Sequence, residues 1–270
     1  MVVFAGQGDA RRSMDLLWRG NGPAAAVRRP GPGPRPGLTV DAIVEAAVAV
    51  ADADGMPALS MRAVGERLGR TAMALYTYVP GKSELVDLMY DQVLAELPAG
   101  YPQAAGWRAA VTAWADDSWA FHLRHPWVLQ VSQARPVLGP NEYRALEALI
   151  GALAGTGLPG GRLRRIVGAL VGYVRGSVRT AAEAREAAAA TGVGDDEWWF
   201  GRASLLAEVA PDFAERFPLL AALEQDRTAA FEQDDSVPYQ EREARETFTA
   251  GLAVLLDGVE AAIARAVPPA

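Results

Sequence analysis

A group of side chains that can bind anions lies in the first third of the 270-residue sequence. It consists of Arg62, Thr71, Tyr76, Tyr78 and Lys82. Guanidinium and ammonium groups pair with phosphate, and hydroxyl groups donate hydrogen bonds to phosphate oxygens. Threonine can also bond to a base edge or place its methyl group against that of thymine. Such residue types, so close together in the sequence, can form a surface that binds anions.

Lys82 is the only lysine among 26 basic residues. It follows Pro80 and Gly81, which stop one predicted helix, and it begins the next. The N–H groups and the dipole of a helix N-terminus attract anions. We therefore expect Lys82 to contact a phosphate, and the alternative is a solvated charge at the start of a helix.

The apolar pattern places these side chains on three short helices and a longer connector. Thr39 is a candidate N-cap for the first helix, which ends at Gly55 and Pro57. Ser60 caps a second helix, and Gly69 supplies the conformational freedom that a tight turn needs.

The third helix is expected over residues 71–78 and the fourth over residues 82–97. In the third, Leu75 and Val79 lie four residues apart and face the core, so the residues around them turn outward. Three short helices and a connector within about sixty residues form a helix-turn-helix module.

Residues 38–97 resemble the DNA-binding domain of the tetracycline-repressor (TetR) family of transcriptional regulators. The matching residues, in chain order, are Ala46, Ala47, Gly55, Leu59, Ser60, Arg62, Leu68, Gly69, Leu75, Tyr76, Tyr78 and Lys82. Two positions depart from the family's pattern: Arg70 stands where a small apolar residue is usual, and Tyr78 where many members have histidine. A phenol still bonds to phosphate but cannot become cationic.

The resemblance implies that the module binds double-stranded DNA at a palindromic operator. Together with the outward face of the third helix, it gives the expected contacts: Ser60, Met61, Arg62, Thr71, Ala72, Met73, Ala74, Tyr76, Thr77, Tyr78 and Lys82. Two of these have alternatives, because Arg62 can pair with Glu66 four residues later and Met73 can pack inward. Arg28, Arg29 and Arg35 form either a DNA-contacting arm or a solvated tether.

The rest of the chain is also predicted to be helical, which makes the fold all-α. About six further helices are expected, over residues 107–124, 127–134, 140–155, 161–190, 196–222 (interrupted near Pro211) and 239–266. We expect three parts: a flexible, basic extension rich in proline and glycine (1–37), the DNA-binding domain with its connector helix (38–97), and a ligand-binding and dimerisation domain (98–270). Parts of the last resemble the C-terminal domain of actinobacterial members of the family.

A homodimer is expected, because helix-turn-helix modules usually bind two half-sites about 34 Å apart. Two helices have faces suited to close packing between helices: one carries glycines at intervals of four, and the last carries an apolar stripe. These candidate interface residues are Gly168, Gly172, Gly176, Leu252, Leu255, Val259 and Ile263. Both faces can instead belong to the core of one chain.

A small, mostly apolar effector is the other partner that the resemblance implies. Aromatic side chains and neighbouring polar groups supply the material of such a site. The candidates are Trp114, Ser118, His122, Trp127, Gln130 and Tyr173, with Trp198 and Trp199 as further aromatic surface. Aromatic residues at helical spacing are often plain core, which is the alternative for each of them.

Charge and composition limit the other possibilities. Residues 1–82 hold ten basic and seven acidic side chains, a net charge of +3, whereas residues 83–270 carry −10. The sequence has no cysteine, no phosphate-binding loop, no nucleophile elbow and only two histidines, His122 and His125, so we expect no enzyme activity, cofactor or metal. Its apolar runs are too short for a membrane span, and we expect a cytoplasmic protein. The alternative function is an all-helical ligand-binding or scaffold protein whose helix-turn-helix does not bind DNA.

Overall fold

The computed structural model of the chain describes residues 2–19, 37–228 and 237–266. Over these ranges the protein is all-α, and its one β-type contact is an isolated parallel bridge between Val3 and Val131. The chain forms two compact units, Met1–Arg175 with Leu252–Ala270, and Gly176–Gly251.

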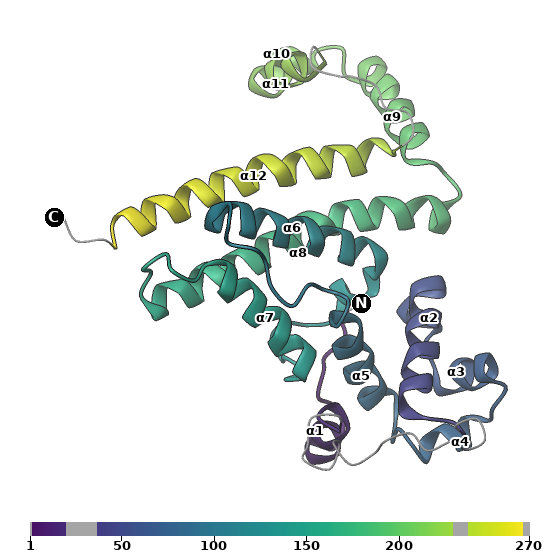
Figure 1. Ribbon diagram of the computed structural model, residues 1–270. Coiled ribbons are helices and arrows are strands. Elements are labelled where there is room, and N and C mark those ends of the chain that lie inside the picture. Colours follow the sequence, from purple (N-terminus) through teal and green to yellow (C-terminus); the bar gives the residue numbers. More distant parts are fainter. Residues whose placement is uncertain (1, 20–36, 229–236, 267–270) are drawn as a thin grey trace. The chain divides into compact units, whose positions relative to one another are not determined.

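Figure 1 shows the helices in chain order. They are α1 (Ala10–Leu17), α2 (Val40–Ala58), α3 (Met61–Leu68), α4 (Ala72–Tyr76), α5 (Lys82–Leu94), α6 (Gly106–Arg124), the 3-10 helix η2 (Pro126–Gln130), α7 (Pro140–Ala152), α8 (Gly160–Thr191), α9 (Asp195–Val209), α10 (Phe213–Arg216), α11 (Pro218–Thr228) and α12 (Tyr239–Ala264).

Side-chain caps start the three helices of the N-terminal module, and the caps at Thr39 and Ser60 are the predicted ones. The hydroxyl of Thr39 accepts from the Ala42 N–H at 3.1 Å, and that of Ser60 from the Ala63 N–H at 3.1 Å. Thr71 caps α4 more weakly, at 3.4 Å. Gly55 has a φ of 73° and bends the last turn of α2. Because each cap satisfies an N–H that has no partner within its helix, the starts of α2, α3 and α4 are fixed locally.

The turn between α3 and α4 depends on two glycines. Gly69 adopts the left-handed conformation (φ 64°, ψ 35°) that ends α3. Gly65 is needed for a different reason: a Cβ there would lie 2.7 Å from the carbonyl oxygen of Arg70. The chain after α3 therefore passes directly over Gly65, which sets the position of α4 on α3.

The core of the module is formed by α2, α3, α4 and α5. Leu75 and Val79 are fully buried, as their four-residue spacing predicts. They pack in one cluster with α2 side chains such as Ile43 and with α5 side chains such as Met89. The outer face of α4 is thereby left to solvent.

The structure corrects one sequence-based expectation in the body and refines another, because the interruption expected near Pro211 is present and a second one lies before Pro218. Residues 127–134 were expected to form a helix, but only η2 forms, because Val131 is extended and pairs with Val3. The helix expected over 196–222 is divided into α9, α10 and α11. Pro211 and Pro218 lie at the two divisions, which accords with the effect of proline on a helix.

The N-terminal extension also differs from the expectation of a flexible segment. Residues 2–19 are an ordered part of the first unit. Helix α1 packs on α5, and Ala5 and Leu17 are buried in the main core. The expected arm residues Arg28, Arg29 and Arg35 lie outside the described residues.

Candidate DNA-binding surface and ligand cavity

The outward face of α4 presents the side chains predicted to contact DNA. Met73 is 75% exposed, which decides against its inward packing, and Tyr76 and Tyr78 are also exposed. Thr71 and Thr77 are exposed, whereas Ala72 and Ala74 are half-buried. A surface of hydroxyls, small side chains and one flexible thioether at a helix N-terminus fits the dimensions and donor pattern of a DNA major groove.

Met61 is the one predicted contact whose side chain faces inward. It is only 5% exposed, because it is the first residue of α3 and packs into the core of the module. Its neighbour Ser60 is exposed. Any contact of Met61 with DNA is therefore restricted to its backbone N–H, which at this position lacks a partner within the helix.

Both of the predicted cations have partners inside the protein. The Arg62 guanidinium pairs with Glu66 at 2.8 Å, and both side chains are well exposed. The Lys82 ammonium donates to the carbonyl of Leu59 at 2.6 Å, so it ties the start of α5 to the end of α2. An ammonium has three N–H donors, which leaves Lys82 able to contact a further acceptor.

A cavity of about 430 Å³ lies within the first unit, between α5, α6, η2, α7 and α8. The predicted ligand residues Trp114, Ser118 and His122 line it. Trp127, Gln130 and Tyr173 are not among the residues that line it. The indole of Trp127 is fully buried and donates to Asp52 at 2.8 Å, so it is a structural residue.

Burial holds His122 in its neutral form. Its Nδ1 lies 2.7 Å from the carbonyl oxygen of Ser118 and must donate to it, which leaves Nε2 as an acceptor. Burial and the nearby Arg175 lower the pKa of His122 to about 4. The cavity wall therefore carries a neutral imidazole at neutral pH.

Arg175, Tyr90 and Gln133 also line the cavity, and sequence reasoning missed all three. Arg175 donates to the carbonyls of Val128 at 3.2 Å and Val131 at 3.0 Å, which fixes η2 against α8. Gln133 donates to the Tyr90 hydroxyl at 3.1 Å. No local pattern marks these residues, because they come from segments far apart in the sequence.

Asp91 connects α5 to the start of α7. Its carboxylate accepts from the backbone N–H groups of Asn141 and Glu142, each at 2.9 Å, and so caps α7 from another helix. Gly139 provides no side-chain cap, and a Cβ there would lie 2.1 Å from the Asp91 carboxylate. The start of α7 is therefore held by α5, whose residue Tyr90 lines the cavity.

The predicted dimer residues divide into two groups. Leu252 and Val259 are buried in their own chain, which corrects their assignment, and Leu255 and Ile263 are half-buried. Gly168, Gly172 and Gly176 lie on open positions of α8: within the described part of the chain, no atom outside the local backbone comes within 4 Å of an added Cβ.

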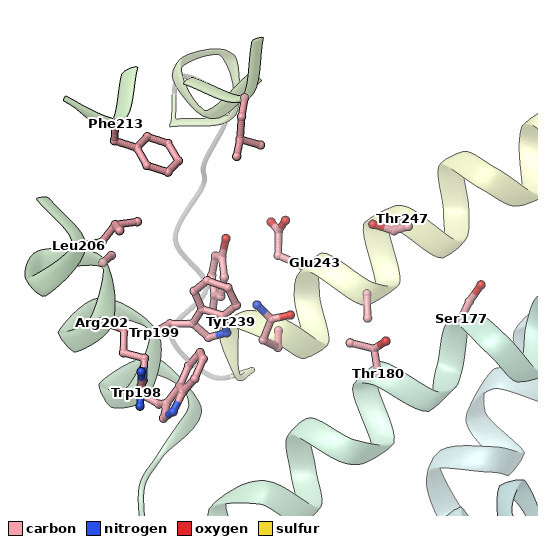
Figure 2. Close-up of a pocket in the computed structure, with 14 residues that line it drawn as sticks. Ser177, Thr180, Trp198, Trp199, Arg202, Leu206, Phe213, Tyr239, Glu243 and Thr247 are labelled. Atoms are coloured by element: carbon pink, nitrogen blue, oxygen red, sulfur yellow. The ribbon is translucent and has the colours of Figure 1, made fainter. Parts of the chain in front are cut away.

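The second unit contains a further cavity, of about 690 Å³, lined by residues of α8, α9, α10, α11 and α12 (Figure 2). Trp198, Trp199 and Tyr239 gather at one end of it, with Trp199 and Tyr239 rings 5.7 Å apart. The Arg202 guanidinium lies 5.1 Å from the Trp198 ring centre. In the described residues of α9 none is buried, so this helix presents much of its apolar surface to solvent.

The described residues contain no group of three or more His, Asp or Glu side chains placed to hold a metal. The histidines have other partners, since His125 bonds to Asp52 at 2.8 Å and Glu96 at 3.2 Å. By length and composition α12 is long and apolar enough to cross a membrane, a test that core helices of soluble proteins also pass.

Comparison with known proteins establishes the family. The family model described as "Bacterial regulatory proteins, tetR family" matches residues 43–89, and "Tetracyclin repressor-like, C-terminal domain" matches residues 99–263. The chain belongs to the TetR family of transcriptional regulators. Membership implies a DNA-binding regulator rather than an enzyme, and a soluble protein of the cytoplasm.

Individual TetR-family relatives agree with this assignment. The HTH-type transcriptional repressor DrrR1 of Streptomyces coeruleorubidus is 40% identical over 263 residues, which cover 97% of this chain and 89% of the relative. The crystal structure of apo ActR from Streptomyces coelicolor has a TM-score of 0.63 and 25% identity, and covers 84% of this chain and 99% of ActR. ActR in complex with (S)-DNPA matches with the same score and identity over 86% of this chain and 100% of ActR.

Proposed function

We propose that this TetR-family chain is a repressor that binds a palindromic operator as a homodimer and is released from it by a small, mostly apolar molecule. One observation carries the proposal: α5 begins beside the helix-turn-helix and carries Tyr90 and Leu94 in the wall of the 430 Å³ cavity. A molecule that fills the cavity therefore contacts the helix on which the DNA-binding module is built.

We assign DNA binding to domain 38–97, with α4 in the major groove. The contacts proposed are Thr71, Ala72, Met73, Ala74, Tyr76, Thr77, Tyr78, Ser60, Arg62, Lys82 and the backbone of Met61. We expect residues at the start of α4 to meet base edges, and Tyr78 and Lys82, beyond its C-terminal end, to meet phosphates. Replacing a residue that contacts a base should change the sequence preference. Replacing a residue that contacts a phosphate should lower the affinity for all DNA sequences alike.

We assign effector binding to the cavity in domain 98–270, with α5 as one wall. Its volume lies in the range of small-molecule sites, and Trp114, Phe121 and Leu149 give it apolar walls. Polar and charged side chains also line it, and they include Ser118, His122, Gln133, Glu142, Arg164 and Arg175. An aromatic molecule with one or two hydrogen-bonding groups matches this lining, and ActR has been solved in complex with (S)-DNPA.

We assign dimerisation to the open face of α8. Gly168 and Gly172 leave room for the close approach of another helix. The dimer then presents two α4 helices to half-sites about 34 Å apart. Effector binding would change that separation, and DNA would weaken effector binding by the same factor, because the two equilibria are linked.

The test is selection of DNA fragments from a random pool by the purified protein, followed by release with candidate effectors. We expect a palindromic site whose affinity falls steeply as salt rises. Retention of no fragment at low salt would refute DNA binding. An operator affinity that is unchanged by every compound shown to occupy the cavity would refute release.

One observation favours a second function, a ligand-binding or scaffold protein whose helix-turn-helix does not bind DNA. Arg62 and Lys82, the two cations expected on DNA, are both engaged within the chain. In that case binding to every fragment would be weak and would lack a preferred sequence. The selection experiment therefore separates the two functions.

A further inference from the structure

Residues 2–19, which we call the strap, make a strand-like contact with residues 130–132, which lie between the cavity-lining residues Val128 and Gln133. The N–H of Val3 donates to the Gln130 carbonyl at 2.8 Å, and the Ser132 N–H donates to the Val3 carbonyl at 2.8 Å. On its other side the same stretch is held by Arg175, which donates to the Val131 carbonyl. The strap and the cavity-lining Arg175 thus both form hydrogen bonds with the backbone of residues 130–132.

The strap then crosses α5, where two buried carboxylates accept its backbone N–H groups. Gly6 donates to both oxygens of Asp87, at 3.1 and 3.2 Å, and Asp9 donates to Glu84 at 3.3 Å. Asp87 and Glu84 are 2% and 7% exposed. A buried carboxylate without such donors is costly, so α5 in this position depends on the strap.

The far end of the strap contacts a strained residue at the rim of the cavity. The Trp18 indole donates to the Leu138 carbonyl at 3.0 Å. Leu138 has a φ of 61°, a conformation that leucine adopts only when its surroundings impose it. The N–H of Leu138 is held in turn by Glu142 at 2.6 Å, and Leu138, Glu142 and Tyr143 all line the cavity.

The last described residue of the strap reaches the DNA-binding module. The Arg19 guanidinium bonds to Asp41, in the first turn of α2. The strap thereby contacts the end of η2 at Gln130, the rim of the cavity at Leu138, the connector helix at Asp87, and the start of α2. In Figure 1, α1 lies beside α5.

From these contacts we propose that the strap is a second structural connection between the effector cavity and the DNA-binding module, which acts in addition to α5. It fixes the angle at which α5 carries the module, and a change at the Leu138 rim is passed through Trp18 and Arg19 to α2. Neither matched family model includes the strap, since the first begins at residue 43. The proposal rests on the proposed function for its effect on DNA but not for the link itself.

The link is tested by amide hydrogen exchange on the full chain and on the double variant Trp18→Phe/Arg19→Ala. This variant removes two partly exposed contacts and leaves the core intact. We expect exchange to rise about threefold or more both in residues 130–143 and in residues 40–50, since both segments lose an anchor. Deletion of residues 2–19 should raise it further. Arg11→Ala, on the exposed face of α1, is the matched control and should change neither segment.

DNA binding is measured in parallel on selected fragments with two half-sites and with one. The double variant should lose about tenfold in affinity for the two-site fragment and little affinity for the single-site fragment. The reason is that the spacing of the two modules matters only when both bind. Exchange that rises only inside residues 2–19, or equal affinities of variant and parent for the two-site fragment, would overturn the proposal. If the parent binds no DNA, the proposed function fails, while the exchange data still decide whether the link exists.

Discussion

The Nε2 atom of His122 and a guanidinium nitrogen of Arg175 lie 3.4 Å apart in the wall of the cavity. The imidazole is 7% exposed and donates through Nδ1 to its own helix, so it can only accept from the arginine. A proton on Nε2 would place two cations side by side in a buried site. The cavity wall therefore carries a neutral hydrogen-bond acceptor, His122, beside the fixed positive charge of Arg175.

Replacement His122→Asn should remove an acid-sensitive element of stability. The pKa of His122 in the folded protein is about 4, below its usual value of 6.5. The unfolded chain therefore binds the proton more tightly between these values, and stability falls as the pH is lowered through that window. Urea unfolding at pH 7.5 and 4.5 should show a smaller acid loss in the variant than in the parent. Equal losses would contradict a neutral, buried imidazole.

Asp87→Asn should change the pH dependence in the opposite direction. Burial, together with the nearby Glu84, raises the pKa of Asp87 to about 6, despite the hydrogen bond from Gly6. A raised carboxyl pKa means that the folded protein binds the proton more tightly, so this contribution is complete below about pH 4 and is lost as the pH rises through 6. The asparagine variant keeps an acceptor for Gly6 without the charge. Its stability relative to the parent should be greater at pH 7.5 than at pH 4.5, as measured by urea unfolding.

Gly65→Ala should destabilise the DNA-binding module, because the new Cβ would lie 2.7 Å from a backbone oxygen. Clashes with backbone cost about 1–3 kcal/mol in well-packed sites. Gly151→Ala is the matched control, since a Cβ at this exposed position of α7 meets nothing within 4 Å in the described structure. It should be neutral or stabilise by up to about 1 kcal/mol. Thermal unfolding of both variants gives the comparison, and a stable Gly65→Ala protein would contradict the packing of α4 on α3.

Lys82→Met should weaken binding to all DNA sequences to a similar extent. The methionine keeps most of the aliphatic stem but lacks the charge and the hydrogen bond to Leu59. The slope of log affinity against log salt should fall in magnitude by about 0.9 for each phosphate that the variant no longer neutralises. Arg216→Ala, an exposed cation at the end of α10, is the control and should leave the slope unchanged. An unchanged slope for Lys82→Met would mean that Lys82 contacts no phosphate and serves only through its hydrogen bond to Leu59.

The sequence by itself determined the local structure of the DNA-binding module. Thr39, Ser60 and Thr71 each start a helix through their own side chain, and Leu75 and Val79 face inward because they lie one turn apart. Caps and helical periodicity act over three or four residues, so they can be read directly from the chain. The family motif extends over the same short range.

The cavity and the strap were decided by tertiary structure alone. Arg175 meets His122 across 53 positions, and Gly6 meets Asp87 across 81. Such pairs leave no local pattern, because an arginine or a buried carboxylate is recognised only by the partner that folding brings to it. For the same reason the sequence marked Trp127 as a candidate ligand residue, whereas in the structure it is buried and donates a hydrogen bond to Asp52. Local rules fix helices, whereas the packing of distant segments decides which side chains share a site.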